Sequence, residues 1–221
     1  MPAWTRSFAR LLNLFLESNC PLCQRSTANA FCLDCQRQVQ RCQLHHFQPS
    51  ERGSLPLLAW GGYEGALKRS LAALKYNNSP QLARPLGHWL AQAWLESPLV
   101  AVKPITVVPI PMHEAKKRQR GFNQAELLAE AFCDVAKVPL QRHGLVRVRE
   151  TEAQFRLSAT ERSQNLANAF EVNESLRDGR PQSAVLLLDD IYTTGATANA
   201  AVAALRRHRV AVCGMVAVAK S

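Results

Sequence analysis

The chain has 221 residues, is 47% hydrophobic and carries a formal net charge of +10. That length suits one α/β domain plus a small module, and the excess of basic residues favours anionic partners. No apolar run is long enough to span a bilayer, and the N-terminal residues lack a signal-peptide cleavage site, so we expect neither a membrane span nor secretion.

Three segments precede the main domain. Residues 1–17 place apolar side chains at helical spacing, which predicts an amphipathic helix docked on the protein body or, alternatively, lying on a membrane surface. Residues 18–47 are rich in cysteine and predict a metal-binding module. Residues 48–54 are polar and contain Pro and Gly, which is typical of a linker. Residues 55–221 form the predicted α/β domain.

The cysteine-rich segment contains two Cys-x-x-Cys pairs separated by eight residues. Two such turns can offer four thiolates to one Zn²⁺ ion in a tetrahedral arrangement. A segment this short has too little core to fold alone, so the metal would supply its folding free energy. Two disulfides are the alternative, which we disfavour because nothing marks a secreted protein and cytosolic thiols stay reduced. The expected zinc ligands are Cys20, Cys23, Cys32 and Cys35.

Three other cysteines and two histidines need separate interpretation. Cys42, with His45 or His46, offers alternative or second-site metal ligands; the simpler interpretation is a structural cysteine followed by a solvated turn. Cys133 lies in a predicted helix and Cys213 in a predicted strand, so both are expected to be small core residues.

The main domain alternates strands with helices. Strands are predicted over residues 55–60, 105–110, 170–172, 185–188 and 210–218, and helices over residues 65–76, 81–96, 123–136 and 198–207. This alternation predicts an α/β fold with a mostly parallel sheet flanked by helices. Because ligands bind at the carboxyl ends of parallel strands, polar residues that follow a strand are candidate site residues.

A basic segment follows the strand predicted over residues 105–110. Four cations lie within five residues, and Gly121 after them permits close approach of the backbone to a ligand. We interpret the segment as a loop that binds a polyanion, either pyrophosphate or a DNA backbone; a solvated basic turn is the alternative. The four cations are Lys116, Lys117, Arg118 and Arg120.

The most specific feature is the run from Val185 to Thr197. It indicates a buried strand, then two carboxylates, then a small-residue turn that leads into a helix. Asp189 and Asp190 suit ribose hydroxyls, while the turn and the helix N-terminus suit a 5′-phosphate. The predicted phosphate-binding residues are Thr193, Thr194, Gly195, Ala196 and Thr197.

A polar, Arg-rich stretch lies between the basic segment and this run. Few apolar residues anchor it, so it is either a mobile flap over the site or surface decoration. The candidate flap residues are Arg149, Gln154 and Arg162.

The run over residues 185–197 resembles the phosphoribosyl-pyrophosphate (PRPP) loop of type I phosphoribosyltransferases. Combined with the cysteine segment, with Val-Pro-Ile-Pro at 108–111 and with Arg-Gly-Phe-Asn-Gln at 120–124, it makes about nine-tenths of the chain resemble the ComF family. The resemblance implies a type I phosphoribosyltransferase fold with an N-terminal zinc-binding segment. It also implies a role in natural competence, where imported single-stranded DNA is handled in the cytoplasm.

The resemblance further implies PRPP with Mg²⁺ as a ligand. Thr193 stands where purine-type phosphoribosyltransferases carry an Asp that serves the base, so a purine-type mechanism is not implied. Three functions stay open at this point. They are a competence protein that binds PRPP and single-stranded DNA, a salvage phosphoribosyltransferase for a nucleobase or nucleotide, and a non-catalytic zinc-dependent scaffold that docks a competence helicase.

Overall fold

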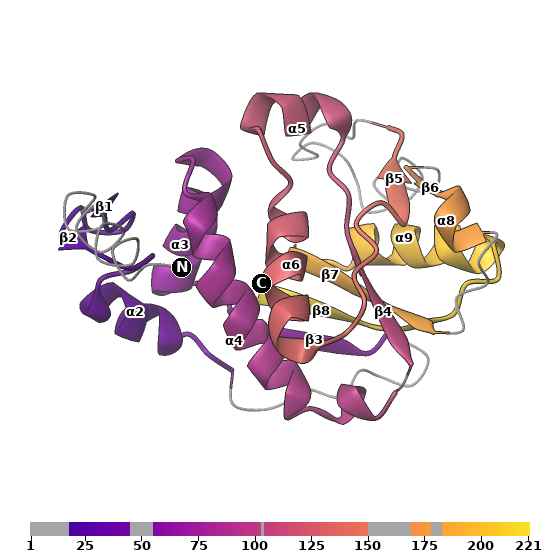
Figure 1. Ribbon diagram of the computed structural model, residues 1–221, viewed down its shortest axis with the longest axis horizontal. Coiled ribbons are helices and arrows are strands. Elements are labelled where there is room, and N and C mark those ends of the chain that lie inside the picture. Colours follow the sequence, from indigo (N-terminus) through magenta and orange to yellow (C-terminus); the bar gives the residue numbers. More distant parts are fainter. Residues whose placement is uncertain (1–17, 45–54, 103, 150–168, 178–182) are drawn as a thin grey trace, which may run out of the picture.

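The computed structural model describes residues 18–44, 55–102, 104–149, 169–177 and 183–221 (Figure 1). The helix predicted over residues 1–17 and the linker predicted over residues 48–54 lie outside the described residues. So do His45, His46 and the flap residues Gln154 and Arg162.

A parallel sheet forms the centre of the described structure, with four strands in the order β3-β8-β7-β4. These strands are β3 (Leu57–Gly62), β4 (Ile105–Pro109), β7 (Ala184–Tyr192) and β8 (Val212–Lys220). The chain starts at one edge with β3, crosses to the other edge with β4, and then returns inward through β7 and β8. The two inner strands, β7 and β8, are therefore hydrogen-bonded to a neighbour on each side, and their nearly continuous apolar sequence is typical of strands covered on both faces.

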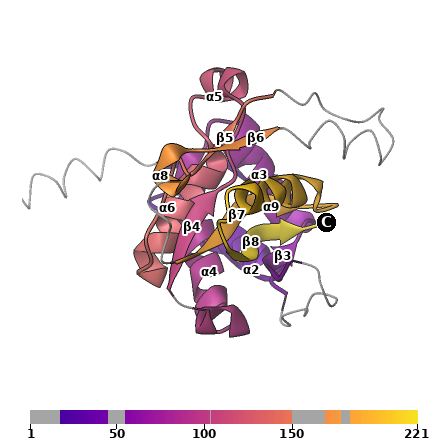
Figure 2. The same cartoon turned by 90° about the vertical axis from the view of Figure 1, so that its right-hand side faces the viewer.

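Helices cover both faces of this sheet. The first face carries α3 (Gly65–Tyr76), α4 (Ala83–Leu95) and α6 (Gln124–Ala136), and the second carries α9 (Ala196–Arg207). Side chains of β7 alternate between the two layers: Leu186 and Leu188 pack with the first group of helices, while Val185 and Leu187 pack with α9. Figure 2 shows α6 and α9 on opposite sides of β7.

Short elements complete the fold. The 3₁₀ turns η1 (Pro80–Leu82) and η2 (Pro98–Ala101) flank α4. Strands β5 (Leu145–Arg147) and β6 (Phe170–Val172) pair antiparallel beside α9, and α8 (Glu174–Arg177) follows them. Phe170, Val172 and Leu176 extend the core on the α9 side of the sheet.

The cysteine segment contains β1 (Ser18–Asn19), β2 (Ser26–Thr27) and α2 (Leu33–Gln40), and it lies beyond α3 and α4 at one end of the molecule (Figure 1). Helix α2 packs on α3, and the Phe31 ring stacks on Trp89 of α4, which in turn stacks on Trp60 of β3. Gln43 bridges antiparallel to Gly61, so the segment also covers the exposed edge of β3. Cys20, Phe31, Cys35 and Val39 thus belong to the same buried core as α3 and α4.

The predicted fold class, an α/β fold of the type I phosphoribosyltransferase kind, is confirmed, with a four-cysteine cluster on its N-terminal side. Two local predictions were wrong. Residues 114–120, expected as a basic loop, form helix α5 (Glu114–Arg120). The strand expected to end at Leu188 continues to Tyr192, because β8 pairs with it that far through Lys220.

Candidate functional site

Two carboxylates, Asp189 and Asp190, lie near the C-terminal end of β7, at the carboxyl edge of the sheet. Asp190 is buried, and its Oδ2 atom lies 2.5 Å from the Nζ atom of Lys75 near the end of α3. Asp189 is partly buried, and its Oδ1 atom accepts a hydrogen bond from the Asp190 backbone N–H at 2.8 Å. Segments distant in sequence therefore bring one cation and two carboxylates together.

This cluster perturbs the protonation of its members. Burial and the neighbouring Asp190 charge raise the pKa of Asp189 well above its usual range. Burial opposes the charged form of Lys75, but the attraction of Asp190 outweighs it and raises the pKa of Lys75. Lys75 therefore stays charged, whereas Asp189 favours a proton, a hydroxyl donor or a cation at its oxygens.

The predicted phosphate turn follows directly. Gly195 adopts φ 76° and precedes α9, which begins at Ala196 rather than near residue 198. A Cβ atom at Gly195 would overlap the Tyr192 hydroxyl and ring, so both the backbone angle and the space require glycine. Thr193 and Thr194 are exposed, the Thr194 hydroxyl accepts from the Ala196 N–H at 3.4 Å, and Thr197 faces the cleft below the carboxylates.

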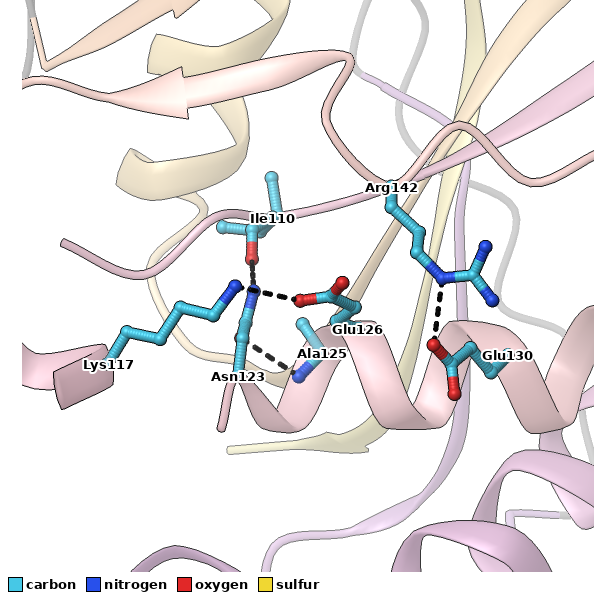
Figure 3. A network of polar contacts seen from close by, with 7 residues as sticks. All are labelled: Ile110, Lys117, Asn123, Ala125, Glu126, Glu130 and Arg142. Atoms are coloured by element: carbon cyan, nitrogen blue, oxygen red, sulfur yellow. Dashed lines mark hydrogen bonds and ion pairs between the residues drawn. The ribbon is translucent and has the colours of Figure 1, made fainter. Parts of the chain in front are cut away.

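The junction between α5 and α6 also lines the site through Asn123 and Gln124, and Figure 3 shows the polar contacts at this junction. The Asn123 amide donates to the Ile110 carbonyl at 3.2 Å, and its Oδ1 caps α6 by accepting from the Ala125 N–H at 3.1 Å. Asn123 therefore ties the start of α6 to the end of β4. Further along α6, Glu130 pairs on the surface with Arg142, which follows the helix, at 2.8 Å (Figure 3).

Helix α5 distributes its cations in different directions. Lys117 pairs with Glu126 of α6 at 3.3 Å (Figure 3), and it lines neither of the two hollows described below. Arg120 donates to the Gln124 side chain at 2.5 Å, and its guanidinium lies 5.4 Å from the centre of the Tyr76 ring. Gly121 ends the helix with φ 86°. The helix periodicity thus separates cations that are adjacent in the sequence.

Two adjoining hollows open at this edge of the sheet. A cleft of about 210 Å³ contains Asp189, Asp190 and Thr197, and a groove of about 740 Å³ lies between the end of α3 and α5, against Asn78 and Arg118. The two hollows share four lining residues, which are Lys75, Tyr76, Lys116 and Arg120. The predicted ribose-binding carboxylates and three of the four predicted anion-binding cations, all but Lys117, therefore face connected spaces.

Sequence reasoning assigned no role in this site to Lys75 or Tyr76, which end a helix whose apolar spacing predicted a core contact. Arg147 of β5 lines the cleft, with its guanidinium 5.6 Å from the Phe170 ring centre. It begins the polar, Arg-rich stretch that was interpreted as a flap over the site or as surface decoration. Arg149 is exposed just beyond β5.

The four cysteines form a candidate metal centre. Their Sγ atoms all lie within 4.8 Å of one another, and those of Cys23 and Cys32 are 3.5 Å apart. Tetrahedral ligands with Zn–S bonds of about 2.3 Å lie about 3.8 Å apart, so this set fits one zinc ion. All seven cysteines of the chain are free thiols, so the disulfide alternative finds no support.

The local backbone positions these thiols. Gln24, with φ 64°, closes the first Cys-x-x-Cys turn by donating its N–H to the Cys20 carbonyl at 2.8 Å. Cys32 is the N-cap of α2, which places Cys35 in the first helical turn. Burial opposes ionisation of Cys20, but backbone N–H groups, including that of Cys32, lower its pKa to about 7. Burial and the other thiols raise the pKa of Cys35. A bound cation would stabilise all four thiolates together.

The remaining cysteines lie apart from this cluster. Cys42 points its thiol toward the carbonyls of Gln38 and Glu64, at 3.6 and 3.7 Å. Burial raises the pKa of the Cys133 thiol to about 12 and also raises that of Cys213. Both pack against the core, as expected of small apolar side chains.

Among the described helices, none has the length and apolar character that a membrane crossing requires.

Fold and site together define an α/β protein of the type I phosphoribosyltransferase fold that carries a four-cysteine module at its N-terminal side. No protein-family model matches the chain. It is 30% identical to "Competence protein ComFC" of Bacillus subtilis, over 80% of this chain and 67% of that protein. It is 29% identical to "Competence protein F" of Haemophilus influenzae, over 85% and 84% of the respective chains. "DNA utilization protein YhgH" of Salmonella typhimurium is 28% identical, over 81% and 74%. The chain belongs to the ComF family.

Proposed function

We propose that this protein binds PRPP or a related ribose phosphate in the cleft between β7 and α3, and that it acts in the uptake or processing of single-stranded DNA in the cytoplasm. The observation that carries the first part is the buried Lys75–Asp190 ion pair beside Asp189, at the carboxyl edge of a parallel sheet and next to the glycine turn that opens α9. The printed names of the relatives support the second part.

The cleft offers each part of such a ligand a chemical partner. Asp189 and Asp190 would accept hydrogen bonds from the 2′- and 3′-hydroxyls, and the raised pKa of Asp189 favours such a donor over an empty site. Residues 193–197 would bind the 5′-phosphate through backbone N–H groups and hydroxyls. Lys116 and Arg120, which line the cleft, would bind the pyrophosphate. When bound, Mg²⁺ would neutralise phosphate charge, held mainly by ligand oxygens and water.

Phosphoribosyl transfer is the reaction that this arrangement suits. The bond from ribose C1 to pyrophosphate would break, with the electron pair leaving on pyrophosphate, while an acceptor forms the new bond to C1 and loses a proton. The carboxylates would stabilise the positive charge that develops on the ring. A salvage enzyme would use the same site with a nucleobase or nucleotide as the acceptor, whereas a non-catalytic scaffold that docks a helicase would transfer no phosphoribosyl group.

Calorimetric titration of the zinc-loaded protein with PRPP and Mg²⁺ tests the ribose-phosphate site. The wild type should bind, and Asp189→Asn/Asp190→Asn should lose binding because the hydroxyl acceptors lose their charge. Asp134→Asn, an exposed change on α6, is the matched control and should bind as the wild type does. Equal affinity of the wild type and the double variant would contradict the assignment.

Binding of single-stranded DNA is tested separately. The net charge of +10 and the cations facing the groove predict that affinity falls steeply as salt concentration rises. Fluorescence anisotropy of a labelled oligonucleotide across a salt series measures this slope. An affinity that does not change with salt would contradict electrostatic binding of the strand.

A further inference from the structure

The groove between α3 and α5 contains an aromatic side chain in an unusual position. Tyr76 is 75% exposed at the end of α3, although a ring of this size usually packs against other side chains. The guanidinium of Arg120 lies over the ring at 5.4 Å from its centre, which orients the ring without covering it. Tyr76 therefore stays largely exposed where it lines the groove.

Positive charge surrounds this ring. Arg118 and Gln119 of α5 line the groove with Lys116, and Asn78 contributes an amide from the turn after α3. Lys117 is turned away to Glu126, so the groove receives only part of the charge of α5. A flat ring beside the guanidinium groups of Arg118 and Arg120 is a combination that suits a flat, polarisable base joined to a phosphate.

The groove also adjoins the proposed ribose-phosphate cleft. Lys75 and Tyr76 face both hollows, and Lys75 is the residue whose Nζ atom contacts Asp190. A ligand in the groove would therefore lie next to a ligand in the cleft, with the same short stretch of α3 between the two.

We infer that the α3–α5 groove is a nucleoside-phosphate site, in which the base stacks on Tyr76 and the phosphate contacts Arg118 and its neighbours on α5. This inference deepens the proposed function and rests on it only in placing a second ligand beside the ribose phosphate. The same chemistry is offered by a free nucleotide and by one unit of a single strand, and the experiment distinguishes these sources.

The test uses the full zinc-loaded protein with a labelled ten-residue oligo-dT strand, and with dTMP as competitor. Tyr76→Ala should weaken strand binding about tenfold, in the range found for loss of one base–aromatic stack, whereas Tyr76→Phe should stay within about twofold of the wild type. Arg118→Gln should reduce the slope of log affinity against log salt by about 0.7, the value for one lost contact to a single-stranded phosphate. Arg206→Gln, an exposed cation at the far end of α9, should leave that slope unchanged.

The outcomes are separable from those of the ribose-phosphate proposal. Displacement of the labelled strand by dTMP, with the same dependence on Tyr76, would assign the site to free nucleotides. Displacement of the labelled strand by unlabelled strand but not by dTMP would assign the site to nucleic acid. Equal strand affinity of Tyr76→Ala and wild type, or no binding of either probe by the wild type, would overturn the inference. PRPP titrations of the same proteins report on the cleft. A wild-type protein that binds the strand but not PRPP would reject only the ribose-phosphate proposal.

Discussion

The candidate metal centre and the proposed ribose-phosphate cleft are built in opposite ways. All four cysteines lie within residues 20–35, and two tight turns and the start of α2 bring their thiols together. The cleft instead combines Lys75 from α3, Arg120 from α5 and Asp190 from β7. A local site can be recognised from spacing alone, whereas a site assembled by a parallel sheet depends on which strands become neighbours.

This difference can be tested most severely by removing the metal ligands. Cys20→Ser/Cys23→Ser should abolish zinc binding and unfold the module, because structural zinc contributes on the order of 10 kcal/mol to the folding of such segments. Native mass spectrometry should show one zinc in the wild type and none in the variant, and hydrogen exchange should show lost protection in α2. Retention of one zinc by the variant would mean that other residues supply the ligands.

The stability of the fold around the cleft should depend on Lys75, which is distant from Asp190 in sequence but pairs with it in space. Lys75→Met removes the cation beside two carboxylates and should reduce the free energy of unfolding at neutral pH by about 3 kcal/mol. Denaturant unfolding measures this change. Lys75→Met/Asp190→Asn should recover part of the loss, because the double variant no longer buries an unpaired charge. A double variant less stable than the single one would contradict this account of the pair.

Two glycines separate backbone strain from crowding. Gly195→Ala should cost about 2–3 kcal/mol, since the new Cβ meets the Tyr192 ring at a positive φ. Gly121→Ala has a similar φ but no atom within 4 Å of its Cβ, so it should cost only about 1 kcal/mol. Thermal unfolding of both variants gives the comparison. Equal costs would show that Tyr192 moves aside readily.

The smallest expected effect is a change in pH dependence at Asp189. Its pKa is raised in the folded state, so the folded protein holds a proton that the unfolded chain releases, and stability falls as the pH rises from the ordinary carboxyl range through the folded pKa. Asp189→Asn removes this loss. Its melting temperature should exceed that of the wild type at neutral pH and match it in acid. A difference that does not change with pH would contradict the assigned shift.

Much of the fold was predictable because it follows from local patterns. Helix α3 was predicted with its observed ends, Gly65–Tyr76, and Asn123 was correctly placed at the start of α6, where it caps the helix. Helix α5 was missed although its sequence, Glu-Ala-Lys-Lys-Arg-Gln-Arg before Gly121, contains good helix formers and a C-terminal glycine. The concentration of charge there had suggested a loop, and the charge is in fact spread over the faces of a helix.

By itself, the sequence determined the four-cysteine cluster, the order of the main strands and helices along the chain, and the acidic and glycine-containing run after Leu188. Each of these is a contiguous pattern whose geometry follows from backbone periodicity or from a tight turn. Only the tertiary structure decided that Lys75 pairs with Asp190, that Lys117 turns toward Glu126, and that Tyr76 faces a groove beside the cleft. These contacts depend on the packing of α3 and α5 around the edge of one sheet, and no spacing within any single segment records that packing.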